Sequence, residues 1–339
     1  MEPRGHGGRV DGRTPMIRGR TGRILAAFAV LVALTATADA QSYPTRLIKL
    51  MHGFPPGGNV DAVARLMAQE MSKSLGQPIV VEGKPEQAGS LAAEAVAGAE
   101  PDGYTLLLVS GAHPATAAVY KKLKYRPVDD FEWISTVSFY PFILCARKDS
   151  ALQTFADLLQ AARAKPDSVT SGTAGNGSIA HMTTELIAGM ANVRLLSVPY
   201  RGEALALTGL LSGDVDFVVS TTTLAGPHIR SGEVRALGVT SKTRWKDFPD
   251  VATIAEAGLA DLDVISWSGI AAPANTPKPI VERLHAEMQR AISVPDVRAR
   301  LESFGADVRG LTPADMRALV ERQLALWTKV AKEANIQLE

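Results

Sequence analysis

The sequence predicts an α/β fold in which two halves enclose a binding cleft. After residue 40, apolar strand-like runs alternate with segments of helical period almost to the end of the chain. Glycine-rich turns also lead from a strand into a helix in both halves, at residues 53–61 and 173–178. The first amides of a helix lack partners inside it, and the helix dipole favours negative charge there. Two such helix starts predict a cleft that closes on a small anion.

The first half contains three predicted strands at 47–51, 79–82 and 105–109, with helices at 61–75 and 91–99 between them. The first helix has a clear apolar period, formed by Val60, Val63, Ala64, Met67, Met71 and Leu75. Pro101, Asp102 and Gly103 mark a turn before the third strand. The long apolar segment 139–146 that follows is expected to pass from one lobe to the other.

The second half begins with Thr154 and Asp157, which are spaced to cap a helix that runs to about residue 164. Four more strands are predicted at 169–172, 195–198, 215–219 and 236–240, and helices at 178–190 and 203–211. Residues 264–273 form a second apolar crossing. Helices at 279–292 and 295–304 follow, and Thr312, Pro313 and Asp315 predict the start of a last helix over 313–335.

Residues 1–40 have the features of a secretory signal peptide. Arg18, Arg20 and Arg23 precede an apolar run of 11 residues at 24–34, which is too short to span a bilayer as an anchor. Ala38-Asp39-Ala40 fits a cleavage site, so the mature chain is expected to start near Gln41. The chain contains no twin-arginine signal, which favours the general secretory route into the periplasm. Met16 is a second possible start.

The mature composition argues against nucleic acid or an anionic membrane as a partner. Removing six arginines and three acids with residues 1–40 leaves 30 basic and 32 acidic residues, a formal charge of −2. Cys145 is the single cysteine, so an internal disulfide is excluded, and we expect it to be a small buried apolar residue. No later segment is apolar and long enough to insert in a membrane.

Motifs for catalysis, metals and cofactors are missing from the sequence. It contains no G-x-S-x-G, P-loop, H-E-x-x-H or paired cysteines, and its histidines do not have metal-ligand spacing. Residues 175–180 formally match G-x-G-x-x-A, which raises a dinucleotide site as an alternative. The next strand does not end in the Asp or Glu that would bind a ribose, so an anion site is the better interpretation. We expect no catalytic residue, no metal and no cofactor.

Motifs across nearly the whole mature chain resemble the exported solute-binding receptors of tripartite tricarboxylate transporters, often called the Bug family. No single match is specific, but their order and spacing are. They are Tyr43-Pro44, Phe54-Pro55-Pro56-Gly57-Gly58 with Asp61 and Arg65, Leu75-Gly76-Gln77-Pro78, Pro101-Asp102-Gly103-Tyr104-Thr105-Leu106, Gly175-Asn176-Gly177-Ser178 with His181, Val198-Pro199-Tyr200-Arg201-Gly202, Gly232-Glu233-Val234-Arg235-Ala236-Leu237, Glu256-Ala257-Gly258 and Ala272-Pro273 with Thr276-Pro277.

The resemblance implies a two-lobed periplasmic-binding-protein fold, type II-like, with two crossover strands and the ligand in the interlobe cleft. We expect lobe 1 to comprise 41–142 and 267–339, and lobe 2 to comprise 143–266. The implied ligand is a small organic anion, such as a di- or tricarboxylate, an amino acid or an aromatic acid. The implied partners are the membrane permease subunits of the transporter, and we expect the receptor to be a monomer.

Candidate ligand-binding residues come from the glycine loops and from the ends of predicted strands. Asp61 is left out of this set and interpreted as a structural residue, because its negative charge would oppose an anionic ligand. Phe54, His181 and Arg201 also have structural interpretations, as a core aromatic, a helix-packing histidine and a solvated or salt-bridged arginine. The full set is Phe54, Gly57, Gly58, Asn59, Ser110, Gly111, His113, Thr173, Gly175, Asn176, Gly177, Ser178, His181, Tyr200, Arg201, Ser220, Thr221 and Thr222.

Two other functions remain open at this stage. The closed protein could dock on a membrane receptor kinase and report the ligand instead of delivering it. Alternatively, similar loops could belong to an exported α/β hydrolase or isomerase, which would be recognised by substrate turnover. The sequence also differs from the family at Ser220-Thr221-Thr222-Thr223, where many relatives carry Asp and Asn.

Overall fold

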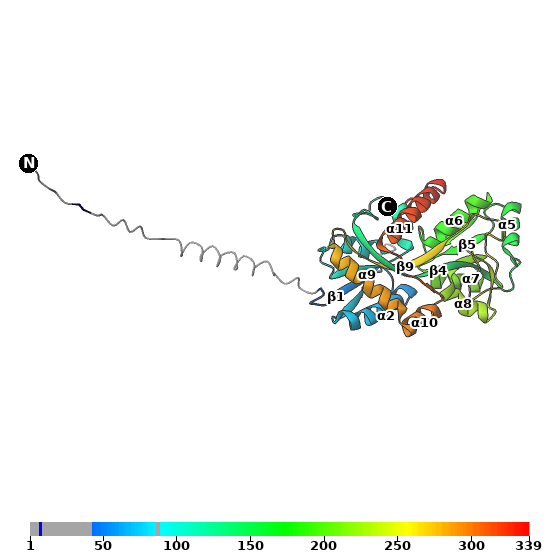
Figure 1. Cartoon of the computed structure of the whole chain (residues 1–339). Coiled ribbons are helices and arrows are strands. Elements are labelled where there is room, and N and C mark those ends of the chain that lie inside the picture. The colour runs from blue at the N-terminus through cyan, green and yellow to red at the C-terminus, as the bar shows by residue number, and fades with distance from the viewer. Residues whose placement is uncertain (1–6, 9–42, 86–88, 339) are drawn as a thin grey trace, which may run out of the picture. The chain divides into compact units, whose positions relative to one another are not determined.

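The computed structural model describes residues 7–8, 43–85 and 89–338. Contacts divide the chain into two units, Met1–Thr45 and Arg46–Glu339, and all of the described helices and strands belong to the second (Figure 1). The predicted signal core at 24–34 and the cleavage site at Ala40 lie outside the described residues. The account below concerns Arg46–Glu339.

A ten-stranded mixed sheet forms the centre of this unit, with eight strands in the order β2-β1-β3-β9-β4-β7-β5-β6 and with β8 and β10 also paired to β4. β1, β2 and β3 are parallel, as are β5, β6 and β7, whereas β4 and β9 run antiparallel to their neighbours. The strands are β1 (Ile48–His52), β2 (Ile79–Gly83), β3 (Thr105–Ser110), β4 (Phe131–Arg147), β5 (Thr170–Thr173), β6 (Leu196–Pro199), β7 (Phe217–Thr221), β8 (Val234–Val239), β9 (Ile265–Pro273) and β10 (Asp307–Val308).

The 17-residue strand β4 joins the two groups of parallel strands. Its first part, up to Pro141, pairs with β9, and from Phe142 onward it pairs with β7. Nearly every residue of β4 is buried, which explains why its sequence is apolar on both faces rather than alternating. The predicted crossings at 139–146 and 264–273 are thus parts of β4 and β9, which lie near the middle of Figure 1. The exact lobe boundaries at 142/143 and 266/267 stay a prediction.

Helices cover the sheet and follow the strands in the alternating order expected for an α/β chain. They are α2 (Asn59–Leu75), α3 (Ser90–Ala97), α4 (Ala112–Val119), α5 (Phe155–Ala164), α6 (Ile179–Ala191), α7 (Glu203–Ser212), α8 (Thr222–Arg230), α9 (Lys278–Ser293), α10 (Pro295–Ser303) and α11 (Pro313–Glu333). No helix within the described ranges has the length and apolar content needed to cross a bilayer.

Helix α11 packs into two separate hydrophobic clusters. Met316 and Val320, near its start, pack with residues of β1, β3 and β9. Trp327 and Val330, two to three turns later, belong to the cluster that contains residues of β4, α5 and α6. The helix therefore contacts both groups of strands, and its neighbours include α4 and α6 as well as β4.

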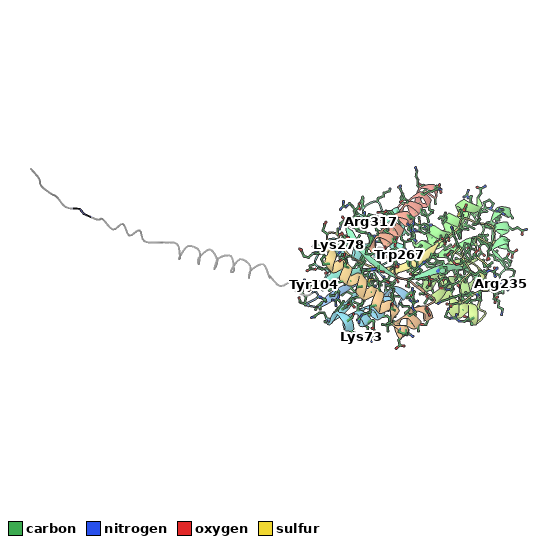
Figure 2. All side chains as sticks on the ribbon, in the orientation of Figure 1. Lys73, Tyr104, Arg235, Trp267, Lys278 and Arg317 are labelled. Atoms are coloured by element: carbon green, nitrogen blue, oxygen red, sulfur yellow. The ribbon has the colours of Figure 1, made fainter. Side chains whose placement is uncertain are left out.

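The middle of α11 is fixed to the crossing strand β9 by one amide side chain. Gln323 Oε1 accepts a hydrogen bond of 2.7 Å from Trp267 Nε1, and Gln323 Nε2 donates one of 3.1 Å to the carbonyl of Ile265. Trp267 is fully buried, and Figure 2 labels it near the centre of the folded part. Since Tyr and Trp carry polar atoms into the core, the indole N–H needs a partner there.

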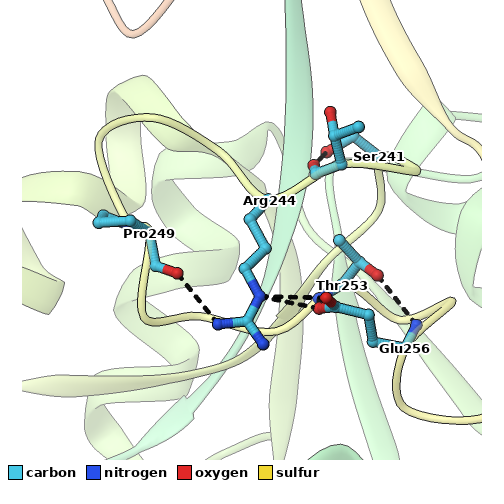
Figure 3. Close-up of polar contacts among 6 residues, drawn as sticks. Ser241, Arg244, Pro249, Thr253 and Glu256 are labelled. Atoms are coloured by element: carbon cyan, nitrogen blue, oxygen red, sulfur yellow. Dashed lines mark hydrogen bonds and ion pairs between the residues drawn. The ribbon is translucent and has the colours of Figure 1, made fainter.

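The loop from β8 to β9 is organised around Arg244 (Figure 3). Its Nε donates to both carboxylate oxygens of Glu256, at 3.2 and 3.0 Å, and its Nη1 donates to the Pro249 carbonyl at 3.2 Å. Thr253 and Glu256 exchange backbone-to-side-chain hydrogen bonds in the manner of a capping box. These bonds hold the segment that leads into the second crossing.

Three short elements differ from the sequence prediction. The sequence analysis assigned no helix to α4 or α8, which are short and each contain a proline, Pro114 or Pro227. The two-residue strand β10 has too little periodicity to be detected. The other predicted elements are present, although β4 begins at Phe131, eight residues before the predicted crossing 139–146.

We predict that Gln323→Ala lowers the free energy of unfolding by about 1–3 kcal/mol. The substitution leaves the buried Trp267 N–H and the Ile265 carbonyl without a partner, and that is the usual magnitude for an unsatisfied buried group. Urea denaturation followed by tryptophan fluorescence measures the change. Gln160→Ala, on the exposed face of α5, serves as the control and should lie within about 0.5 kcal/mol of the wild type. Equal effects of the two substitutions would contradict the role of Gln323.

Candidate functional site

The first glycine loop ends in a helix start whose amides have no side-chain cap. Gly57 has a φ of 82°, a left-handed conformation that favours glycine. Gly58 is the N-cap of α2 and has no side chain to cap the first turn. Both glycines are exposed. This is the geometry in which backbone N–H groups and the helix dipole favour an anion.

Asp61 supports this loop from inside the helix. Its Oδ2 accepts a 2.9 Å hydrogen bond from the Gly57 amide, and its carboxylate also pairs with Arg65. The hydrogen bond from Arg65 holds the pKa of Asp61 below its usual value, although burial acts in the opposite direction. The structure thus engages Asp61 in the loop itself, in agreement with its interpretation as a structural acid.

His52 completes the support beneath the loop. Its Nδ1 accepts from the Phe54 amide at 3.3 Å, so that Nε2 carries the proton and donates to Asp61 Oδ1 at 3.1 Å. The side chain is fully buried, and this burial lowers the pKa of His52. A neutral histidine therefore lies between β1 and the start of α2.

The second glycine loop repeats this arrangement with a histidine. Gly177 has a φ of 72°, and its amide donates to His181 Nδ1 at 3.0 Å, four residues ahead, as Gly57 does to Asp61. Ser178 is the N-cap of α6, and its Oγ accepts from the His181 amide at 3.3 Å. His181 Nε2 lies 3.6 Å from Glu185. Several donors that the sequence suggested for a ligand are thus used within this loop.

Two glycines bring the first loop against the start of α3. A Cβ added at Gly53 would lie 2.0 Å from the Cα of Gly89, so the two backbones meet directly. Gly89 itself has a φ of 91° and is the N-cap of α3. Phe54, Ser110 and His113 line a small cavity beside this contact. The loops after β1, β2 and β3 therefore converge.

His113 lies in an aromatic cluster at the start of α4. Its ring is 5.7 Å from that of Tyr125 and 5.4 Å from that of Phe131, and Nε2 donates to the Pro127 carbonyl at 2.8 Å. Burial lowers the pKa of His113 to about 4. A neutral, hydrogen-bonded core histidine is the role that the structure gives this candidate.

Tyr140, in the crossing strand β4, connects the first loop to both crossing strands. Burial raises the pKa of Tyr140, and the side chains of Ser266 and Asn59 act on it in the opposite direction. Ser266 in turn lies against Gly111, since a Cβ at Gly111 would be 3.0 Å from its Oγ. The starts of α2 and α4 therefore meet β4 and β9 at one place, around Tyr140.

Glu203, in the second half of the chain, acts electrostatically on the same tyrosine. It is the first residue of α7, and its carboxylate accepts hydrogen bonds from Ser220 Oγ, at 2.7 Å, and from the amide of Thr221. Its charge acts on the Tyr140 hydroxyl. Burial raises the pKa of Glu203, and the hydrogen bonds from Thr221 and Ser220 oppose that shift.

Several buried polar atoms without partners in the described part of the chain belong to residues at helix starts and strand ends. Among the described residues, Asn59 Oδ1, Thr173 Oγ1 and Thr222 Oγ1 are buried and have no hydrogen-bond partner. Native proteins pair nearly all such atoms, so an unpaired one requires an explanation. All three residues were predicted to bind the ligand, and they come from the starts of α2 and α8 and from the end of β5.

Four other predicted residues are packed on a helix, exposed to solvent or part of a turn. The Tyr200 hydroxyl lies over Gly209 of α7, where a Cβ would be 2.3 Å away, so this ring packs on the helix. Arg201 and Asn176 are exposed. Gly175 has a φ of 117° and shapes the loop without presenting a side chain. Among the described residues, Arg201 forms no ion pair within 4 Å.

Sequence reasoning missed Tyr140, Ser266 and Glu203. Tyr140 and Ser266 lie in the segments that were predicted to cross between the lobes, and each places a hydroxyl within an apolar run. Glu203 was assigned to a helix start, where an acid needs no further explanation. The signal for Glu203 is its position one residue after Gly202, at the end of a β-to-α turn like those that were assigned to the site.

No group of three or more His, Cys, Asp or Glu side chains suited to a metal ion occurs within the described ranges. Cys145 is fully buried in β4 and unpaired, as expected for a small apolar residue.

We predict that His113 makes the protein less stable as the pH falls from about 6.5 to about 4. In this window the unfolded chain takes up a proton that the buried ring does not, so the free energy of unfolding falls by up to about 1.4 kcal/mol per pH unit. His113→Gln should flatten this part of the curve. Urea denaturation at a series of pH values compares the slopes of the two proteins. His52 contributes in the same direction, so a smaller slope should remain in the variant.

Parallel stability curves for the wild type and His113→Gln would contradict this assignment. The comparison of slopes is independent of any constant loss of stability caused by the substitution itself.

Comparison with known proteins identifies the family. The model of the family described as "Tripartite tricarboxylate transporter family receptor" matches residues 63–336. A protein from the tcbD-tcbE intergenic region of a Pseudomonas species is 37% identical over 314 residues, covering 92% of this chain and 94% of that protein.

Two solved structures are similar over nearly their whole length. The periplasmic binding protein BugD is 33% identical with a TM-score of 0.77, and 88% of this chain and 100% of BugD are covered. MatC from Rhodopseudomonas palustris, solved with bound malate, is 36% identical with a TM-score of 0.76, covering 85% and 99% of the two chains. The fold is thus that of a two-lobed periplasmic binding protein, and the family and its neighbours are solute-binding proteins rather than enzymes. The chain belongs to the receptor family of the tripartite tricarboxylate transporters.

Proposed function

We propose that this protein is an exported receptor that captures a small carboxylate-bearing metabolite between its lobes and delivers it to the membrane permease of a tripartite transporter. The observation that carries the proposal is the start of α2, where Gly58 is the N-cap and leaves the first amides without a side-chain cap. MatC, which is similar in fold and sequence, was solved with malate, a dicarboxylate. A carboxylate is the anion that such a helix start accommodates.

The proposed binding motion is closure of lobe 2 (143–266) on lobe 1 (41–142 and 267–339). β4 changes its partner strand between Pro141 and Phe142, which supports a hinge at that point. One polar contact joins the proposed lobes at the start of α8, where Thr223 Oγ1 donates to the carbonyl of Phe304. Closure can be driven by ligand contacts that exist only when both lobes meet.

The proposed partners and location follow from the family. Receptors of this family serve a tripartite permease by their description, and BugD is a periplasmic binding protein. The periplasm is therefore the proposed compartment for this protein as well. We propose that residues 1–40 direct export by the general secretory route, with cleavage near Ala40.

We predict that the mature protein isolated from the periplasm starts at or near Gln41. The short apolar core at 24–34 followed by Ala38-Asp39-Ala40 is the basis for this expectation. Intact-mass measurement and N-terminal peptide mapping of the native protein determine the start. Recovery of the full segment 1–40 on the native protein would exclude cleavage.

We predict that Gly58→Asp weakens binding of the carboxylate ligand at least tenfold, which is about 1.4 kcal/mol. The new carboxylate would lie at the helix start that is proposed to hold the ligand and would repel it. Ligands are first identified by a thermal-shift screen of carboxylates, because a ligand at 100 times its Kd stabilises the fold by about 2.7 kcal/mol. Calorimetry then gives the affinities of the variants.

Gly58→Ala is the matched control. Gly58 has a φ of −77°, and a Cβ there would have as its nearest neighbour the Pro55 carbonyl oxygen, at 3.6 Å, so alanine should fit without strain. We expect its affinity to stay within about threefold of the wild type, and circular dichroism should show both variants folded. Full affinity in Gly58→Asp would remove the first loop from the site.

A further inference from the structure

Two contacts join the proposed lobes on opposite sides of the crossing strands β4 and β9. In the view of Figure 1, α11 and α6 meet above these strands, and α8 and the end of α10 meet below them. Each contact connects a segment of proposed lobe 1 with a segment of proposed lobe 2. The two contacts differ in their chemistry, and this difference bears on how the lobes can move.

The contact on the α11 side is apolar and continuous with the core. Trp327 of α11 is only 1% exposed and belongs to the same hydrophobic cluster as Ala180 and Met182 of α6. Burial of apolar surface is favourable and does not depend on direction, so separating these helices would return that surface to water at a cost. Lobes joined in this way can rotate about the contact, but we do not expect them to part there.

The chain that follows α11 extends the apolar contact. The Leu338 amide donates to the Val119 carbonyl at 2.8 Å, and the Leu338 carbonyl accepts from the Lys121 amide at 3.1 Å, so this tail pairs with the end of α4. A Cβ added at Gly177, in the second glycine loop, would lie 2.7 Å from Val119 Cγ2 and 2.8 Å from Leu338 Cδ1. Two side chains of proposed lobe 1 thus pack directly on the backbone of a loop of proposed lobe 2.

The contact on the α8 side is small and polar. Thr223 Oγ1 donates to the carbonyl of Phe304, the residue that ends α10. Lys246 Nζ lies 3.9 Å from a carboxylate oxygen of Glu302. Thr222 Oγ1 is buried without a hydrogen-bond partner among the described residues, a cost that ends once water reaches it. Because water can replace such bonds at little net cost, the lobes can separate on this side.

Gly305 lies in the polar contact and presents no side chain to it. Its φ is 76°, and a Cβ there would lie 2.9 Å from Thr222 Oγ1, 3.5 Å from Thr222 Cβ and 3.7 Å from Asp247 Oδ2. Both of these neighbours belong to proposed lobe 2, so a side chain at Gly305 would press on the opposite lobe. A glycine lets the end of α10 approach the start of α8 this closely.

We propose that the lobes pivot on the apolar contact between α11 and α6 and open at the polar contact between α8 and α10, where Gly305 limits how closely they approach. This inference rests on the proposed function, in which the lobes close on a ligand, and it adds the direction of the motion and the residue that limits it. Only the closed fraction of the protein holds the ligand between both lobes, and the apparent affinity scales with that fraction. The affinity is therefore sensitive to the space at Gly305.

The test measures distances on both sides of the purified mature protein by double electron–electron resonance between spin-labelled cysteines. Ala299 in α10 with Asp250 reports on the opening side, and Gln160 in α5 with Thr328 in α11 reports on the pivot side. All four residues are exposed, whereas the single native cysteine, Cys145, is fully buried and will not take a label. Without ligand, we expect a broad distribution with a longer component for the first pair and a narrow distribution for the second.

Ligand should then remove the longer component on the opening side. The probe is malate, succinate or glutamate, whichever stabilises the protein most in a thermal-shift screen, added to saturation. We expect the Ala299–Asp250 distribution to collapse to its shorter distances and the Gln160–Thr328 distribution to stay as it was.

Gly305→Asn tests the limit on closure. Asparagine adopts left-handed backbone more readily than most residues, so it adds bulk toward Thr222 with little conformational cost. We expect the longer component on the opening side to grow and the affinity for the probe to fall at least about threefold, with the pivot side unchanged. Gly76→Asn is the matched control. Gly76 has a φ of 67°, and a Cβ there would meet no described atom within 4 Å, so distances and affinity should not change.

Thr223→Val provides a second variant in case Gly305→Asn does not fold. It keeps the shape of the side chain but removes the hydroxyl that donates to Phe304, so it should favour opening in the same direction by a smaller amount. Circular dichroism checks the fold of every variant.

The outcomes distinguish this inference from the proposed function. Narrow distributions for both pairs, a Gln160–Thr328 distribution that broadens more than the Ala299–Asp250 one, or unchanged distances in both Gly305→Asn and Thr223→Val would overturn the pivot and leave the carboxylate receptor intact. If none of the probes or other carboxylates binds, the proposed function fails, and the distances in the free protein still decide where the lobes part.

Discussion

Every feature of this fold depends on β4 satisfying its backbone hydrogen bonds against two different sets of strands. The strand is paired with β9 and β10 along its first part and with β7 and β8 along its second. A buried strand with an unpaired stretch would leave polar backbone groups without partners. The change from one partner strand to the other must therefore happen within one or two residues. Pro141 lies at this point and still aligns with Ile265 of β9. Tyr140 precedes it directly, which places the central hydroxyl of the site where the two groups of strands join.

The two glycine loops share one hydrogen-bonding pattern but differ in how the following helix is capped. In both, a left-handed glycine donates its amide to a side chain four residues ahead, Asp61 in one loop and His181 in the other. The first loop keeps its helix start uncapped and so retains donors for a ligand. The second has Ser178 as a cap, and its donors are used internally. The two helix starts therefore differ in their free donors, although both loops were predicted from sequence to contact an anion.

The sequence predicted the architecture better than it predicted the site. Apolar periodicity located the long elements, and the two apolar crossings were recognisable because β4 and β9 are buried on both faces. The short helices α4 and α8, each with an internal proline, were not predicted. Site prediction was limited because a residue type does not reveal the direction of its side chain. His113 turned out to hydrogen-bond in an aromatic cluster, whereas Glu203 accepts hydrogen bonds from Ser220 and Thr221, at the end of a strand that follows it in the chain. Such long-range pairs have no local signature in one sequence.

The contact between Gly53 and Gly89 also restricts how this sequence can diverge. Their backbones meet so closely that a methyl group on Gly53 would overlap the Cα of Gly89, and Gly89 needs its left-handed conformation as well. A side chain at Gly53 would overlap the other backbone, so a substitution there requires the opposite loop to move. Gly58, a few residues away, has room for a side chain. Substitutions are therefore expected to be tolerated at Gly58, where they can alter the surface of the first loop. Substitutions at Gly53 are expected to be rejected because they would force the two loops apart, and substitutions at Gly89 because of its left-handed backbone.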